Sequence, residues 1–139
     1  MDKNIFHLNI YSSVKTVCDE DVLFVELPLS SGPYGILFNH ANMFSDVIGG
    51  VGYYKTTDEE IHYFATSGGV LEIKNNSVVF LARTAELAES IDVDRAKISE
   101  EKARERLRSA SPDSDARKAN VRLHKALARQ KAYDLSKRH

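Results

Sequence analysis

The spacing of the apolar residues changes once along this chain of 139 residues, and that change limits the folds open to it. At the start, apolar and polar residues alternate, as in Phe6, Leu8 and Ile10, which is typical of a strand with one buried face. After about Glu86 the apolar residues recur at intervals of three, four or seven, which puts them on one face of a helix. The sequence therefore predicts an α+β fold with strands first and helices second.

The first domain, residues 1–86, is expected to be a flattened antiparallel β-sandwich. Strand patterns begin at Phe6, Val22, Ile61, Val70 and Val78. Ser67-Gly68-Gly69 is expected to form a turn, and Asn75-Asn76-Ser77 a tight hairpin, because asparagine tolerates the left-handed backbone of such turns. Short strands without a regular alternation of strand and helix favour a sandwich over a parallel α/β sheet.

The second domain, residues 91–139, is expected to be an antiparallel hairpin of two helices. Pro112 and the polar residues around it separate the two helical stripes. The stripes are Val93, Ala96, Ala103, Leu107 and Ala110 in the first helix and Ala116, Ala119, Leu123, Ala126 and Leu127 in the second. Because alanine buries little apolar area, at roughly 25 cal/mol per Å² such a seam stabilises the hairpin weakly. We therefore expect a hairpin that can undock or extend.

Composition and charge disfavour several classes of protein. Hydrophobic residues make up 42% of the chain and charged residues 28%, which is a globular composition. The formal net charge of -1 gives no reason to expect nucleic acid, and no run approaches the roughly 18 apolar residues of a membrane span. Cys18 lies beside acidic residues that would raise its thiol pKa, so a reactive thiol is not expected. Residues 113–139 hold eight basic residues, which fits either an acidic partner surface or a solvated helix face.

We expect neither a catalytic residue nor a metal site. The five histidines show no metal-ligand spacing with one another or with Cys18. Ser67-Gly68-Gly69 lacks the strand–helix context of a nucleophile elbow, and the sequence holds no phosphate loop or dinucleotide motif. Asp92 has a structural interpretation as the N-cap of a helix that begins at Val93.

Several stretches, taken together, resemble a known family. They are Gly35–Leu37 followed by His40–Ala41, Ser67–Ile73, Ala82–Glu86 and Ile91–Ala96. Each stretch is short, but their order over almost the full length is similar to that of the epsilon subunit of F-type ATP synthases from bacteria and chloroplasts. The resemblance covers both expected domains.

The resemblance implies a subunit of the rotor stalk that performs no catalysis of its own. The sandwich would pack on the gamma subunit and on the ring of membrane c subunits, at the cytoplasmic face of the bacterial cell membrane. Contact with the membrane would be indirect, through the complex, and no nucleic acid is implied. The hairpin would either fold against the sandwich or extend along gamma to the catalytic alpha and beta subunits, where it blocks ATP hydrolysis.

Three sets of site residues follow from the resemblance. The set that docks on gamma and the c ring is Gly35, Ile36, Leu37, Phe38, His40 and Met43. The set that meets an acidic segment of beta is Arg117, Lys118, Arg122, Lys125 and Arg129. The set for ATP, an optional regulatory ligand rather than a required cofactor, is Glu86, Ile91, Asp92, Arg95, Ala96, Lys102, Lys118, Lys125 and Arg129.

Departures from the family pattern leave alternatives open. The docking loop lacks the acidic residue that is common in the family and carries Phe38 as an apolar tip, so we expect apolar docking. Lysines replace the arginines of known ATP binders at three positions, so the affinity should be modest. Asp92 can also be a helix cap without any nucleotide. A stand-alone adenine-nucleotide sensor and an unrelated β-sandwich enzyme are the alternative functions.

Overall fold

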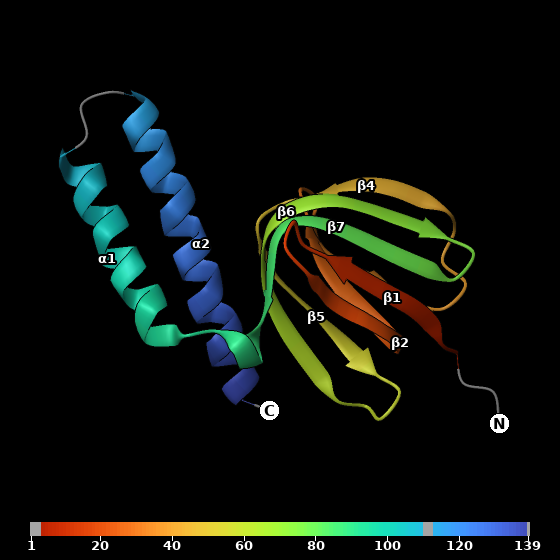
Figure 1. Cartoon of the computed structure of the whole chain (residues 1–139). Coiled ribbons are helices and arrows are strands. Elements are labelled where there is room, and N and C mark those ends of the chain that lie inside the picture. The colour runs from red at the N-terminus through yellow and green to blue at the C-terminus, as the bar shows by residue number, and fades with distance from the viewer. Residues whose placement is uncertain (1–3, 110–112, 139) are drawn as a thin grey trace.

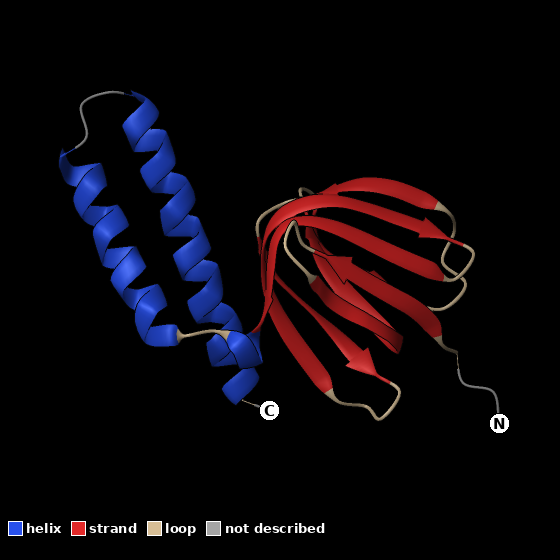
Figure 2. Ribbon diagram, viewed as in Figure 1, coloured by secondary structure: helices blue, strands red, loops and turns tan. Residues whose placement is uncertain are grey.

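The computed structural model describes residues 4–109 and 113–138. Within these residues seven strands come first and two long helices follow, as Figures 1 and 2 show. The expected fold class, a β-sandwich followed by a two-helix hairpin, is confirmed. The expectations placed on Ala110 and Pro112 lie outside the described residues.

The strands form one sheet that closes on itself, because the first strand pairs with two neighbours. Their bounds are β1 (Phe6–Tyr11), β2 (Thr16–Leu29), β3 (Gly32–Ile36), β4 (Met43–Val47), β5 (Gly50–Thr56), β6 (Ile61–Lys74) and β7 (Ser77–Leu87). The sheet order is β1-β7-β6-β5-β2-β3, β4 pairs with β6, and β1 also pairs with β2. The β1–β7 pairing is parallel and the other described pairings are antiparallel. The result is a flattened, closed sandwich whose inner faces form the core.

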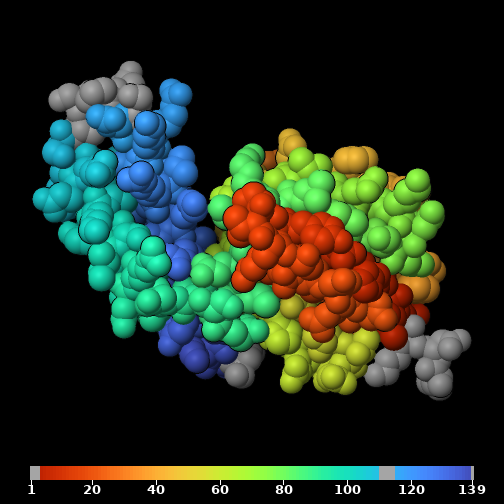
Figure 3. All heavy atoms as spheres, viewed as in Figure 1, coloured from red at the N-terminus to blue at the C-terminus, as the bar shows by residue number. Residues whose placement is uncertain are grey.

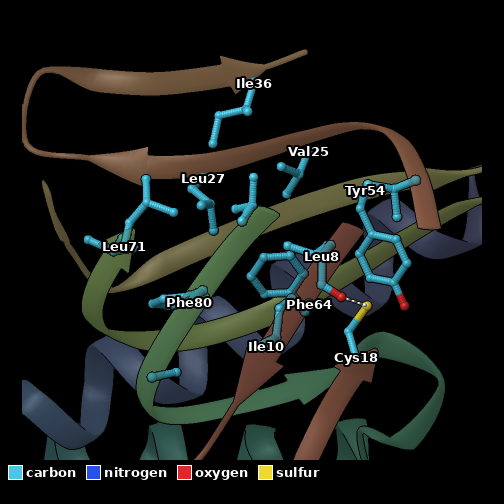
Figure 4. Packing of buried hydrophobic residues seen from close by; sticks show 14 of the residues in the cluster. Leu8, Ile10, Cys18, Val25, Leu27, Ile36, Tyr54, Phe64, Leu71 and Phe80 are labelled. Carbon is cyan, nitrogen blue, oxygen red and sulfur yellow. Dashed lines mark hydrogen bonds between the residues drawn. The ribbon is translucent and has the colours of Figure 1, made fainter. Parts of the chain in front are cut away.

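The core is built from the inward residues of these strands (Figure 4). Tyr54, Phe64 and Phe80 are its largest fully buried side chains. Cys18 is buried with them, and its thiol donates a hydrogen bond of 3.7 Å to the carbonyl oxygen of Leu8. Burial raises the thiol pKa of Cys18 to about 11. The expectation of an unreactive cysteine therefore holds, although burial outweighs the acidic neighbours as its cause.

The Asn75-Asn76 hairpin is as expected, but Ser67-Gly68-Gly69 is not a turn. Both asparagines have positive φ, 51° and 60°, as a two-residue hairpin requires. In contrast, β6 continues without a break through Gly68 and Gly69, and its register with β7 shifts there, which marks a bulge. Gly68 has a φ of 100°, so a glycine suits this position in a bulge as well as in a turn.

The sequence patterns also missed three strands. Gly35 and Ile36, expected in a loop, belong to β3, and β4 and β5 follow within the next twenty residues. These strands are short or rich in glycine, which weakens the period-two signal. The loop itself is limited to the turn between β3 and β4.

The helices are α1 (Val93–Ser109) and α2 (Asp113–Lys137), preceded by the short helix η1 (Ala88–Ser90). The expected alanine seam is confirmed between them. The buried alanines on the helices are Ala96, Ala103, Ala119, Ala126 and Ala132. Leu127 is not part of the seam, because it is exposed and lies on another face of α2.

The C-terminal half of α2 packs on the outer face of β5 and β6. A second, smaller apolar cluster joins the two domains, formed by Tyr63 and Ala65 of β6 with Ala88, Ile91 and Ala132. The hairpin is therefore folded against the sandwich in this structure. Figure 3 shows that the helices meet the sandwich at one end, while their other end stands away from it.

His7 links β1 to β2 at an exposed position and makes the stability of the sandwich depend on pH. Its Nε2 lies 2.6 Å from Asp19 and its Nδ1 2.8 Å from Asp21. The hydrogen bonds to Asp21 and then Asp19 raise the pKa of His7 above its ordinary value of 6.5. The stabilisation is therefore complete below that ordinary value and is lost as the pH rises through the raised one.

We predict that His7→Gln lowers the free energy of unfolding by up to about 1 kcal/mol in mild acid, because exposed ion pairs contribute no more than that. At alkaline pH the two proteins should be nearly equal in stability. Urea unfolding of both proteins at several pH values measures the difference. A difference that is constant or larger at alkaline pH would contradict the assignment.

Candidate functional site

The site centres on the junction between the domains, where Asp92 begins α1. The backbone N–H of Arg95 donates a hydrogen bond of 3.1 Å to Asp92 Oδ1, and the N–H of Ala96 donates one of 3.0 Å to the Asp92 carbonyl oxygen. Asp92 is thus the N-cap of α1, as predicted. One carboxylate oxygen serves the cap, and the side chain is exposed to solvent.

Two other residues of the same motif have structural roles. Ile91 is buried in the cluster that joins the domains, and Ala96 is fully buried in the helical seam. Packing alone therefore accounts for an apolar residue at both positions. Their part in a nucleotide site stays a prediction.

Glu86 and Arg129 form an ion pair between the domains. Arg129 Nε, on α2, donates a hydrogen bond of 2.8 Å to Glu86 Oε1, on β7. The side chains are 33% exposed for Glu86 and 23% for Arg129, so the pair is partly shielded from water. Two residues expected to bind ATP thus contact each other in this structure, and they also hold the hairpin on the sandwich.

A basic groove runs between the two helices next to this pair. Its volume is about 450 Å³, and its lining includes Lys102 and Arg106 from α1 with Arg122, Lys125 and Arg129 from α2. Its other lining residues are small and carry no acidic group. Five cationic side chains around one groove favour a ligand with several negative charges.

The groove gathers some of the expected ATP residues and not others. Lys102, Lys125 and Arg129 line it, whereas Lys118 lies with Arg117 in a shallow depression nearer the start of α2. Arg106 was not among the expected residues. Its spacing of four from Lys102 puts the two on one helix face and could have indicated it.

The expected docking loop is held firmly and offers one large apolar side chain. Leu37 is 61% exposed, but Ile36 is 0% exposed in the core. The expectation of apolar docking through Ile36 is therefore wrong, because Ile36 is at an inward-facing position of β3 and its side chain is buried in the core. Phe38 and Met43 are half-buried against the core. Gly35 is exposed.

Hydrogen bonds fix the shape of this loop. The hydroxyl of Tyr34 and His40 Nε2 lie 2.6 Å apart, and the side chains of Asn39 and Asn76 share a hydrogen bond of 3.1 Å. The backbone N–H of Asn39 also donates to Asn76 Oδ1 at 2.7 Å. The loop is thus tied to the β6–β7 hairpin and is preorganised for contact.

An apolar stripe on the outer face of the sandwich was not expected. Phe44 is 72% exposed and Leu81 55%. Val70 pairs with Leu81 across β6 and β7, and Leu81 pairs with Tyr11 across β7 and β1. We call Phe44, Val70, Leu81 and Tyr11 the outer stripe. The sequence feature that could have indicated the outer stripe is an apolar residue at an outward-facing position in each of these four strands.

A cluster of metal ligands and a membrane-spanning helix are both absent from the described residues. Among the residues that the structure describes, no group of three or more His, Cys, Asp or Glu side chains could hold a metal ion. In the same residues, neither helix is long and apolar enough to span a membrane.

The Glu86–Arg129 pair gives a prediction about docking of the hairpin. Glu86→Gln should loosen α2 on the sandwich by about 1 kcal/mol, since the pair is charge-assisted but partly exposed. Hydrogen exchange in residues 113–138 should then be faster. Arg129→Gln should have a similar effect, and the double variant should cost less than the sum of the two. Strictly additive effects would show that the pair does not hold the domains together.

Two family models match the chain, one for each domain. The model for the ATP synthase Delta/Epsilon chain beta-sandwich domain matches residues 5–88. The model for the long alpha-helix domain of the same chain matches residues 89–134. The boundary between them falls at η1.

Curated relatives cover nearly the whole chain. The ATP synthase epsilon chain of Nitratidesulfovibrio vulgaris (strain DP4) is 37% identical over 131 residues, 94% of this chain and 96% of its own length. The epsilon chain of Desulforamulus reducens is 39% identical over 126 residues, with 90% and 94% covered. That of Desulfitobacterium hafniense (strain Y51) is 40% identical over 124 residues, with 89% and 92% covered.

Solved structures share the fold at low sequence identity. A chain of the Euglena gracilis mitochondrial ATP synthase, in a structure of OSCP/F1/c-ring, has a TM-score of 0.81 at 16% identity, covering 95% of this chain and 83% of that one. A chain from the central stalk/c-ring structure of the Tetrahymena thermophila mitochondrial ATP synthase has a TM-score of 0.63 at 12% identity, covering 96% and 99%. With both domains matched and relatives near 40% identity, the chain belongs to the epsilon chain family of ATP synthases.

Proposed function

We propose that this protein is a non-catalytic part of the central stalk, which couples catalysis to ion-driven rotation through gamma and the c ring. The observation that carries the proposal is the outer stripe, an apolar surface on a chain of this family. Exposed apolar residues that adjoin one another mark interaction sites on soluble domains. The protein would then lie at the cytoplasmic face of the bacterial cell membrane, held there by its partners.

The outer stripe and the docking loop suit two different partners. The stripe runs across β4, β6, β7 and β1 and is broad enough for a long helical partner, which gamma would supply. Leu37 protrudes at the end of the sandwich, beside the β6–β7 hairpin. We assign that end to the c ring and the stripe to gamma.

The hairpin is proposed to regulate ATP hydrolysis by leaving the sandwich. It is held by a small apolar cluster and one partly exposed ion pair, which together permit two arrangements of similar free energy. Extended along gamma, the hairpin would reach the alpha and beta subunits. Arg117, Lys118 and Arg122 would then face an acidic segment of beta, with Lys125 and Arg129 further along the helix.

ATP is proposed to stabilise the folded hairpin from the basic groove. Lys102 of α1 and Lys125 of α2 line the groove from opposite helices, so a polyphosphate between them would hold the helices together. Asp92, exposed at the start of α1, and Arg95, one turn before the groove, would contact the rest of the nucleotide. Because lysine lacks the two-point fork of arginine, the affinity should be modest.

The basic groove also supports the second candidate, a stand-alone adenine-nucleotide sensor. The groove is complete in the isolated chain and needs no partner subunit. A sensor, however, has no use for the outer stripe. Co-purification with gamma distinguishes the two functions.

Leu81→Asp tests docking on gamma. Burying a leucine contributes roughly 1.5–3 kcal/mol, so the variant should bind gamma about tenfold to a hundredfold more weakly. Ile61→Asp, also at an exposed apolar residue of the sandwich but outside the stripe, should bind normally. Affinities can be measured by titration of purified gamma. Equal binding by Leu81→Asp and the native protein would exclude the stripe as the gamma surface.

Removing residues 91–139 tests regulation. ATP hydrolysis by the reconstituted complex should be faster with the shortened chain than with the full chain. With the full chain, rising ATP should relieve inhibition, and a Lys102→Gln/Lys125→Gln variant should need more ATP for the same relief. Arg108→Gln, on the outer face of α1, is the matched control. Equal rates with and without the hairpin would leave only coupling and assembly as functions.

A further inference from the structure

A second cleft lies between α2 and the sandwich, separate from the basic groove. Its volume is about 470 Å³, which is within the range of roughly 300–1,000 Å³ typical of small-molecule sites. Its α2 wall includes Val121, His124, Ala128 and Lys131, which recur every three or four residues and so share one helix face. That face points away from the alanine seam and towards β5 and β6.

The walls of this cleft are largely apolar. Val121 and Leu127 on α2 are exposed and face Val51 and the backbone of Gly49 and Gly50. The two glycines have no side chains to fill the space.

The hydroxyl groups of the sandwich wall are already engaged. The Thr66 hydroxyl donates to the carbonyl oxygen of Thr84 at 2.8 Å, and Ser67 Oγ accepts a hydrogen bond of 2.7 Å from the Thr84 hydroxyl. The wall therefore offers an occupant mainly hydrophobic contact.

The charge in the cleft is all of one sign. Lys125 and Lys131 line it, and within the described residues neither makes an ion pair. His124 donates from Nδ1 to the carbonyl oxygen of Asn120 at 2.8 Å, so its Nδ1 proton is already used. No acidic residue lines the cleft. An occupant with a negative head group thus matches the cleft.

We propose that this cleft binds an aliphatic carboxylate, with its chain along the apolar walls and its head group between the lysines. The helix rises about 15 Å from Val121 to Lys131, so the cleft suits an extended chain better than a compact ligand. The single carboxylate distinguishes this ligand from the polyphosphate that suits the basic groove. Lys125 borders both clefts.

Such a ligand would favour the folded hairpin, because one wall of the cleft belongs to each domain. When the hairpin leaves the sandwich, the cleft no longer exists. A ligand at ten times its dissociation constant should therefore raise the ratio of docked to undocked protein about elevenfold. Only this consequence for regulation rests on the proposed function; binding itself does not.

Dodecanoate, below its micelle-forming concentration, is the probe for the isolated full-length protein. Methyl NMR signals of Val121 and Leu127 should shift with saturation, while those of Ile98, exposed on α1, should not. Dodecanol and dodecyltrimethylammonium should bind at least tenfold more weakly, and acetate should not bind. No saturable shift, or equally tight binding of dodecanol, would overturn the proposal.

Variants locate the head group and the effect on the hairpin. Lys131→Gln should weaken dodecanoate binding at least threefold, whereas Lys97→Gln, at an exposed lysine of α1, should not. Dodecanoate should also slow hydrogen exchange in residues 113–138. Equal effects of the two variants would overturn the site, and binding without slower exchange would overturn the regulatory role. Because gamma is absent, failure here leaves docking on gamma untouched, and loss of docking by Leu81→Asp leaves this test unaffected.

Discussion

The bulge at Gly68 and Gly69 is the constraint on which the rest of the molecule depends. It reverses which residues of β6 face the core. Before it, Phe64 points inward and its neighbours Tyr63 and Ala65 contact the hairpin. After it, Leu71 and Ile73 point inward while Val70 faces outward. One strand thus serves two outer surfaces, one for the hairpin and one for the outer stripe. Without the bulge the parity of β6 would not change, and Leu71 and Ile73 would face outward in place of Val70.

The two outer surfaces differ in how firmly they can hold a partner. The hairpin side relies on small residues and on Glu86–Arg129, and its helices bring five cationic side chains around one groove. Like charges in a shared groove repel one another, which lowers the stability of the folded hairpin. The stripe side has large, exposed apolar groups and no such conflict. Stable attachment through the stripe is therefore compatible with an adjustable hairpin.

The parts of the fold that local patterns determine could be predicted, and the parts that depend on pairing between distant strands could not. The alanine seam, the Asp92 cap and the Asn75-Asn76 hairpin could each be predicted because the residues that indicate them lie close together in the sequence. The bulge resembles a turn in the sequence, because glycine suits both, and only pairing with β4 and β7 shows which is present. Ile36 illustrates the same limit, since its place in the core depends on the pairing of β3 with β2.

In the candidate site, too, local sequence explains part of the structure, and this affects how the motif Ile91–Ala96 is interpreted. In Ile91–Ala96 the buried isoleucine, the capping aspartate and the buried alanine are all explained by packing and capping. Packing and capping therefore account for these three residues whether or not a nucleotide binds. What can separate a binding chain from a non-binding one is the set of side chains around the groove, two turns further along α1. Affinity for a nucleotide should therefore vary with Lys102, Arg106 and their partners on α2, while the motif itself stays the same.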